Sequence, residues 1–181
     1  MAYVKLVFVN DDDTVPINAL NLDHMQTQYD EAKADLDAHS VSRTARVYHD
    51  ASQSIADATA AVLAFNTERY DTDTIHDTVT NNSRLTCKTA GKYRITANVQ
   101  WAANGTGSRG VYIRLNGVTP IAYELIATAS TTLKTIQEVT TVYDLAVNDY
   151  VEMVVYQNSG GALNAETAAN YSPEFMMERV G

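Results

Sequence analysis

Hydrophobic and polar residues alternate strictly between Lys92 and Trp101, and this is the clearest pattern in the chain. Successive side chains of a β-strand point to opposite faces, so a period of two places one row on a core and the other in solvent. The segment therefore predicts a long, half-buried antiparallel strand. The hydrophobic row consists of Tyr93, Ile95, Ala97, Val99 and Trp101.

Short hydrophobic segments between turns continue this pattern from residue 45 onward. Asn116-Gly117 is the sharpest turn signal, because Asn-Gly supplies the positive φ angles of a type I′ hairpin. No helical period separates the segments, which is typical of a β-sandwich. The predicted strands are Ala45–His49, Ala61–Phe65, Arg84–Cys87, Lys92–Trp101, Gly110–Leu115, Val118–Glu124, Thr131–Tyr143, Asp149–Tyr156 and Pro173–Val180.

The first 44 residues follow a different pattern. Tyr3–Val9 predicts a short strand, which the acidic turn Asn10–Thr14 follows. A helix is predicted after Pro16, with Asn18 as its N-cap. Its hydrophobic residues show the 3-4 spacing of a left-handed coiled coil, in which the residues at the seam are Leu22, Met25, Tyr29, Ala32, Leu36 and His39.

The chain is therefore predicted to have three parts: a strand and acidic turn (residues 1–15), a helical stalk (16–44) and a sandwich head (45–181). Tethering to an oligomeric head raises the effective concentration of the helices, which favours a short bundled stalk. The alternative is a helix that lies against its own head.

Charge and composition exclude several partners. The formal charge is −9 at pH 7, and no basic stripe is present, so nucleic acid is not expected to bind. No apolar run approaches the ~20 residues that span a bilayer, and the N-terminus lacks the features of a signal peptide. Cys87 is the single cysteine, which fits a reducing cytosol and predicts a buried packing thiol.

The residues from Leu85 to Ile95 read Leu-Thr-Cys-x-x-x-Gly-x-Tyr-x-Ile. This resembles the signature of the complement globular-head (C-one-q type) family, which shares a trimeric jelly roll with tumour necrosis factor. Departures occur at four positions: Leu85, Ile95 and Ala97 replace aromatic residues, and His76 stands where tyrosine is usual. Further similar segments are Phe65-Asn66, Ile75-His76-Asp77, Arg114–Gly117, Leu145–Val151 and Pro173–Phe175.

This resemblance implies a mainly β fold, namely an antiparallel jelly-roll β-sandwich head, and a homotrimer. Either the sandwich core or the trimer interface is expected to bury Tyr93, Ile95, Val99, Trp101, Val151, Met153, Val155 and Phe175. In the helix, the residues expected in trimer contacts or in the core are Leu22, Met25, Tyr29 and Leu36.

The segment Pro16-Ile17-Asn18-Ala19-x-Asn21-Leu22-x-x-Met25 is similar to the start of many bacteriophage tail-fibre and baseplate proteins. In those proteins a short strand and a helix begin the virion-bound end. The similarity implies a virion protein, made in the host cytoplasm, whose first 15 residues bind other virion proteins.

Three functions compete at this point. The first is a tail-fibre or receptor-binding head that contacts a glycan or protein of the host surface. The second is a capsid head fibre or decoration protein with the same fold. The third, an enzyme that degrades polysaccharides, is disfavoured because composition offers no support for it, although the paired carboxylates that hydrolyse glycosides are a spatial arrangement and stay an open alternative. There is also no Gly-x-Ser-x-Gly elbow, and no Rossmann helix follows Gly105-x-Gly107-x-x-Gly110. We therefore expect no catalytic residue and no cofactor.

Asp71, Asp73 and Asp77 form a carboxylate cluster that suggests a cation. Two carboxylates two residues apart can share a hard cation, and some members of the resembled family bind calcium. No further oxygen ligands are indicated, so a solvated acidic loop is the favoured interpretation and no metal is assigned.

Strand directions locate the predicted contact surface. If the last strand returns to the stalk, Lys88–Gly91, Asn116-Gly117 and Ala146–Asn148 lie at the base, and the loops Ala102–Arg109, Leu125–Ser130 and Gln157–Ser172 lie at the tip. Loops on a rigid sandwich usually carry recognition, although solvated turns are the alternative. The predicted contact residues are Asn104, Thr106, Ser108, Arg109, Asn158, Asn164, Glu166, Asn170 and Tyr171.

Overall fold

The structure is a computed structural model that describes residues 19–40, 42–128 and 130–181. It divides into two units, one ending at Val41 and the other spanning Ser42–Gly181, which we call the head. The predicted strand Tyr3–Val9 and the N-cap Asn18 lie outside the described residues.

The predicted helix is confirmed as α1, Ala19–Ser40. No glycine or proline interrupts it, and side-chain hydrogen bonds such as Gln26 to Asp30 link successive turns. Of the predicted seam residues, Met25, Tyr29 and Leu36 are 51%, 63% and 68% exposed. The side chain of Leu22 is outside the described part. No helix among the described residues is long and apolar enough to cross a membrane.

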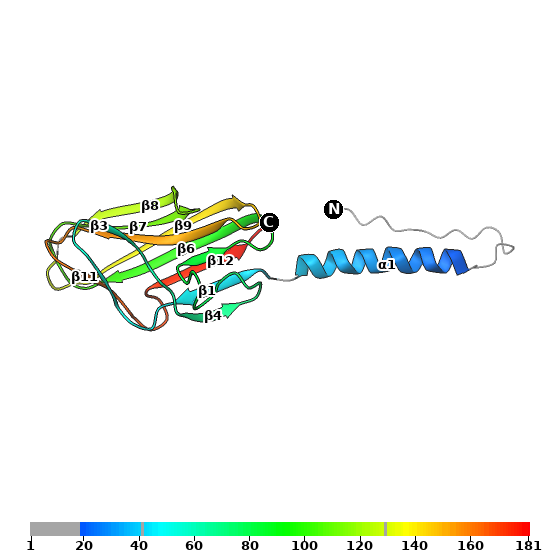
Figure 1. Cartoon of the computed structure of the whole chain (residues 1–181), viewed down its shortest axis with the longest axis horizontal. Helices are drawn as coiled ribbons and strands as arrows, with labels where there is room; N and C mark the ends of the chain where they lie inside the picture. The colour runs from blue at the N-terminus through cyan, green and yellow to red at the C-terminus, as the bar shows by residue number, and fades with distance from the viewer. Residues whose placement is uncertain (1–18, 41, 129) are drawn as a thin grey trace. The chain divides into compact units, whose positions relative to one another are not determined.

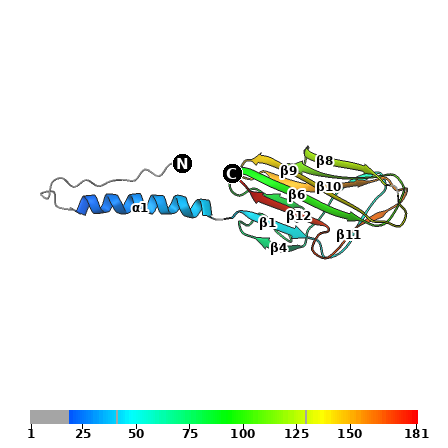
Figure 2. The same ribbon diagram turned by 180° about the vertical axis from the view of Figure 1, so that it is seen from behind.

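The head is a jelly roll of two antiparallel sheets (Figures 1 and 2). The seven-stranded sheet has the order β2 (Gln53–Ile55), β11 (Leu163–Glu166), β6 (Gly91–Trp101), β12 (Glu174–Arg179), β1 (Thr44–Tyr48) and β4 (Thr67–Asp71), and β9 (Thr135–Leu145) also pairs with β6. The five-stranded sheet has the order β3 (Thr59–Val62), β10 (Tyr150–Gln157), β7 (Ser108–Leu115) and β8 (Thr119–Ala127), and β5 (Arg84–Thr86) also pairs with β10.

The hydrophobic core lies between the two sheets. In β6, the alternation of hydrophobic and polar residues determines which side chains enter this core. The hydrophobic row from Tyr93 to Trp101 is fully buried, while Lys92 and Arg94 on the other face are exposed. Phe65 stacks on Phe175 with ring centroids 5.8 Å apart. All eight predicted core residues are confirmed as buried within the single chain: Tyr93, Ile95, Val99, Trp101, Val151, Met153, Val155 and Phe175.

Three strands were not predicted, and each is short or polar. β2 and β11 have three and four residues, and β4 is the charged edge segment Thr-Glu-Arg-Tyr-Asp. The prediction that Gln157–Ser172 is entirely loop was therefore wrong, because β11 lies within it and pairs with β2 and β6. The predicted strand Ala61–Phe65 overlaps β3 only at its first two residues.

The predicted strand directions are confirmed within the head. The amide of Lys92 donates to the carbonyl of Gly181 (2.8 Å) and that of Arg179 to the carbonyl of Arg43 (2.9 Å), so the head begins and ends at one pole, the base. The turn at Asn116-Gly117 also lies there and has positive φ at both residues, as the sequence predicted. The loops before β7 and after β8 and β10 lie at the opposite pole, the tip (Figure 1).

Candidate functional site

The tip loops are held in shape by their own polar side chains. The Asn104 Oδ1 accepts a hydrogen bond from the Thr106 amide (2.8 Å), and the Asn158 Oδ1 accepts one from the Ser108 amide (2.6 Å). Thr106 and Asn158 are exposed, whereas Asn104 and Ser108 are partly buried. These four predicted contact residues therefore share one ordered surface at the tip.

Arg109 differs from the other predicted contact residues because its side chain is completely buried. Its Nη1 donates to the carbonyls of Thr106 (3.0 Å) and Ser108 (2.9 Å), and its Nη2 donates to the carbonyl of Asn104 (3.0 Å). Burial lowers the pKa of Arg109. Arg109 thus positions the 104–108 loop from beneath, and its guanidinium does not face solvent.

The remaining predicted contact residues lie on β11 and the turn after it. Asn164 is exposed on the strand, and Asn170 is exposed with a positive φ of 71°. Glu166 pairs with Lys134 (2.7 Å), and this carboxylate raises the pKa of Lys134. The Tyr171 hydroxyl donates to the Gln100 side chain (2.9 Å). The nine predicted residues therefore form a tip group and a β11 group.

Two of the three aspartates in the acidic cluster bind the backbone of their own loop, whereas Asp73 accepts a hydrogen bond from the Thr89 hydroxyl (3.4 Å) and lies 3.8 Å from Nε of Arg43. Asp71 accepts hydrogen bonds from the amides of Asp73, Ile75 and His76 at 2.8–3.1 Å. Asp77 accepts from the amides of Thr80 and Val79, and these bonds lower its pKa. No group of three His, Cys, Asp or Glu side chains in the described ranges is arranged to hold a metal. The cluster organises the 72–82 loop.

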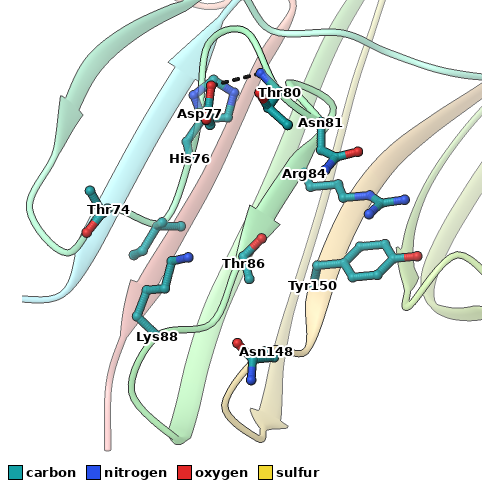
Figure 3. A pocket seen from close by; sticks show the side chains of 11 residues that line it. Thr74, His76, Asp77, Thr80, Asn81, Arg84, Thr86, Lys88, Asn148 and Tyr150 are labelled. Carbon is teal, nitrogen blue, oxygen red and sulfur yellow. Dashed lines mark hydrogen bonds between the residues drawn. The ribbon is translucent and has the colours of Figure 1, made fainter.

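The 72–82 loop forms one wall of a cavity of about 480 Å³ that sequence reasoning missed (Figure 3). We call it the side groove. Its opposite wall comes from β5, the turn that follows β5, and the start of β10. The lining residues are Thr74, Ile75, His76, Asp77, Thr80, Asn81, Arg84, Thr86, Lys88, Asn148 and Tyr150.

Ionic contacts fix the walls of the side groove. Arg84 donates through Nε to Glu152 (3.2 Å), and its guanidinium lies 4.0 Å from the centre of the Tyr150 ring. The ring of His76 is buried and bridges Glu68 (2.9 Å) and the carbonyl of Asn82 (3.1 Å). Several of these residues lie in the family-like segments noted above, but the sequence did not show that the segments meet in one cavity, because they are far apart along the chain.

A second surface is apolar. β8 and β9 are the edge strands of the two sheets and lie side by side in both views (Figures 1 and 2). Tyr123 and Leu125 face outward from the five-stranded sheet, and Ile136 and Val142 face outward from the seven-stranded sheet, so exposed apolar side chains lie on both sides of these strands. Exposed apolar side chains of this kind are candidates for association. We call this surface the β8/β9 edge, and its exposed large hydrophobic residues are Tyr123, Leu125, Leu133, Ile136, Val142 and Tyr143.

Cys87 is buried, as predicted, and its thiol lies 3.2 Å from the carbonyl of Thr89. Burial raises the pKa of the Cys87 thiol, which reduces the fraction of reactive thiolate. We expect a disulfide reagent to leave Cys87 unmodified in the folded protein and to label it fully in denaturant. Absorbance of the released thiolate measures this, and rapid labelling under native conditions would contradict the assigned burial.

No protein-family model and no curated protein sequence matches this chain. Several solved structures are similar to it in fold. Murine APRIL is 8% identical and covers 77% of this chain and 98% of its own, with a TM-score of 0.57. Eiger TNF from S. frugiperda is 9% identical over 77% of this chain and 93% of its own (TM-score 0.58). The globular domain of the zebrafish complement 1qA protein is 11% identical over 75% and 93% (TM-score 0.50).

These similarities agree with the two sheets described above and with the fold expected from the Leu85–Ile95 segment. The head has the jelly-roll fold that tumour necrosis factor-like proteins and complement globular heads share.

Proposed function

We propose that this protein is a homotrimeric binding head on a helical stalk. The β8/β9 edge carries the proposal: Leu125, Ile136 and Val142 are each at least half exposed on adjacent edge strands. Association of copies through this edge would remove these side chains from water. The exposed seam residues of α1, which need partners for the same reason, fit the same assembly.

We further propose that the head belongs to a bacteriophage virion. The support is the similarity of residues 16–25 to the virion-bound end of tail-fibre and baseplate proteins. In this proposal, residues 1–15 bind other virion proteins, α1 forms the stalk, and the tip contacts a glycan or protein on the host surface without catalysis. Three copies of a weak site would add avidity.

Light scattering on the full chain tests the assembly and is expected to report three chains per particle. Ile136→Glu should dissociate the trimer at micromolar concentration, because association would bury an unpaired carboxylate. Val118→Glu is the matched control, since Val118 is 79% exposed in the hairpin at the base. A monomeric wild type, or an Ile136→Glu protein that stays trimeric, would overturn the proposed interface.

The place of the head on the virion is a separate question with a separate test. Gold-labelled copies imaged on intact particles should mark the tail if the head is a tail fibre or receptor-binding protein. Label on the shell would instead support the capsid fibre or decoration role. Purified trimer should also compete with particles for adsorption to host cells, and adsorption unaffected by excess trimer would argue against a receptor-binding function.

A further inference from the structure

The side groove is lined in part by polar side chains that contribute no hydrogen bond to the described part of the fold. In the tip loops, Asn104, Ser130 and Asn158 bind nearby backbone amides. In the groove, by contrast, several hydroxyl and amide side chains make no hydrogen bond with any residue that the structure describes. They line the same cavity (Figure 3), and they are Thr74, Thr80, Asn81, Thr86, Asn148 and Tyr150.

These groups share one chemical property: each can both donate and accept a hydrogen bond. A polyhydroxylated ligand also donates and accepts at every hydroxyl, whereas a phosphate only accepts and would need a concentration of N–H donors. The half-buried ring of Tyr150 adds an apolar surface with a polar tip. A volume of about 480 Å³ lies in the range of small-molecule sites. The lining therefore suits a saccharide.

The charge of the groove specifies the saccharide further. Lys88 is exposed and has no ion pair within the described part of the chain. Arg84 on the same wall shares the carboxylate of Glu152 with Arg114, which does not line the groove, so Lys88 and Arg84 leave this wall positive in a chain of net charge −9. The carboxylate of Asp77 on the other wall is occupied by two backbone amides. An anionic group is thus attracted to the Lys88 side.

The groove is preorganised by its backbone. Thr74, Asn81 and Asn148 have φ angles of 51°, 54° and 73°, and a left-handed conformation is rare for a β-branched residue such as threonine. The amides that Asp71 binds and the buried ring of His76 hold the 72–82 loop in this shape. Residues held in such conformations cluster at ligand sites.

We propose that the side groove binds an acidic saccharide, that is, a sugar bearing a carboxylate. The Lys88 ammonium pairs with the carboxylate, and Thr86 and Asn148 bind the sugar hydroxyls beside the Tyr150 ring. This inference rests on the proposed binding function, and it places the ligand toward the base of the head, where the turns that carry Lys88 and Asn148 lie, away from the tip loops.

A glycan array tests the proposal with the full chain. The probes are oligosaccharides that contain uronic or sialic acid, each printed beside its carboxyl-reduced form. We expect binding to the acidic probes, at least tenfold weaker binding to the reduced forms, and an affinity that falls as salt rises. A wild-type protein that binds none of the acidic probes, or binds the reduced forms equally well, would overturn the proposal.

Point variants locate the site. Lys88→Met, Thr86→Val and Asn148→Gly remove one charge, one hydroxyl and one amide, and glycine tolerates the positive φ of residue 148. Each should weaken binding to the acidic probes about tenfold or more. Lys92→Met is the matched control, because Lys92 is exposed on β6 outside the groove. Binding unchanged in all three groove variants overturns the proposal.

Two further readouts separate this inference from the proposed function. Each variant is checked for an unchanged thermal midpoint and for three chains by light scattering, so that misfolding is recognised. If wild-type and Lys88→Met trimers adhere equally to host cells, the binding function stands and the groove assignment fails. If the wild type neither assembles nor adheres, the proposed function itself fails.

Discussion

Replacing Trp101 with alanine is expected to lower the free energy of unfolding by about 3–5 kcal/mol. The indole is completely buried between the sheets, and its Nε1 donates to the Gln137 side chain (3.0 Å). That amide in turn donates to the carbonyl of Arg109 (3.1 Å), so the substitution leaves a cavity and removes a partner from a buried polar network.

Circular dichroism in a urea titration measures this loss, at one protomer concentration because assembly affects apparent stability. Lys92→Ala, on the exposed face of the same strand, is the control and should change stability by less than about 0.5 kcal/mol. Since Trp101 is the single tryptophan, wild-type fluorescence should resist quenching by iodide. Free quenching would contradict the burial of the ring.

The long strands were predictable because their chemistry is local. In β6, alternation over ten residues allows only one choice of buried face, and a shift by one residue would bury Lys92 and Arg94. The hairpin at Asn116-Gly117 was predictable for the same reason, since two residues specify its turn. Neither depends on a partner far away in the sequence.

The short strands were not predictable, because their partners define them. β11 has only four residues, too few for their alternation to stand out, and it is a strand because Ala165 pairs with both Trp101 and Gln53. β4 is polar and pairs with β1 at the edge of the sheet. Such segments read as loops in isolation, which is why the predicted tip loop Gln157–Ser172 was too long.

The predicted contact residues were also limited to what can be read from local sequence. Thr106 and Asn158 were predictable as exposed tip residues, because strand directions follow from the number of strands. The side groove was not, since Thr74 and Asn148 belong to two different connections and Thr86 to the short strand β5, all far apart along the chain. Only the pairing of β5 with β10 brings them to one cavity.

Arg109 was predicted to be a contact residue because of the residues next to it in the sequence, and the structure shows it buried instead. A cation after Gly105-Thr106-Gly107-Ser108 suggests a surface contact, yet the strand places residue 109 on the inward face of β7. The loop then folds over the guanidinium, and three loop carbonyls take the place of water around the charge. The charge is therefore balanced by backbone dipoles, and the described residues contain no carboxylate in ion-pairing range of it.

Arg109→Met is accordingly expected to lower the free energy of unfolding by about 2–3 kcal/mol, the range for hydrogen bonds to a charged group. Methionine fills much of the buried volume but cannot donate to the carbonyls of Asn104, Thr106 and Ser108. These carbonyls must then turn toward water, so the 104–108 loop should lose its order. In the wild type, the Thr106 and Ser108 amides donate hydrogen bonds to the Asn104 and Asn158 side chains. Hydrogen exchange of these two amides should become faster in the variant.

Arg94→Met is the matched control, since Arg94 is half exposed on β6 and pairs with Glu178 at the surface (3.3 Å). A surface pair of this kind contributes less than about 1 kcal/mol, so this variant should unfold close to the wild type. If Arg109→Met were as stable as Arg94→Met and kept slow exchange at Thr106 and Ser108, the guanidinium would not be what orders the tip.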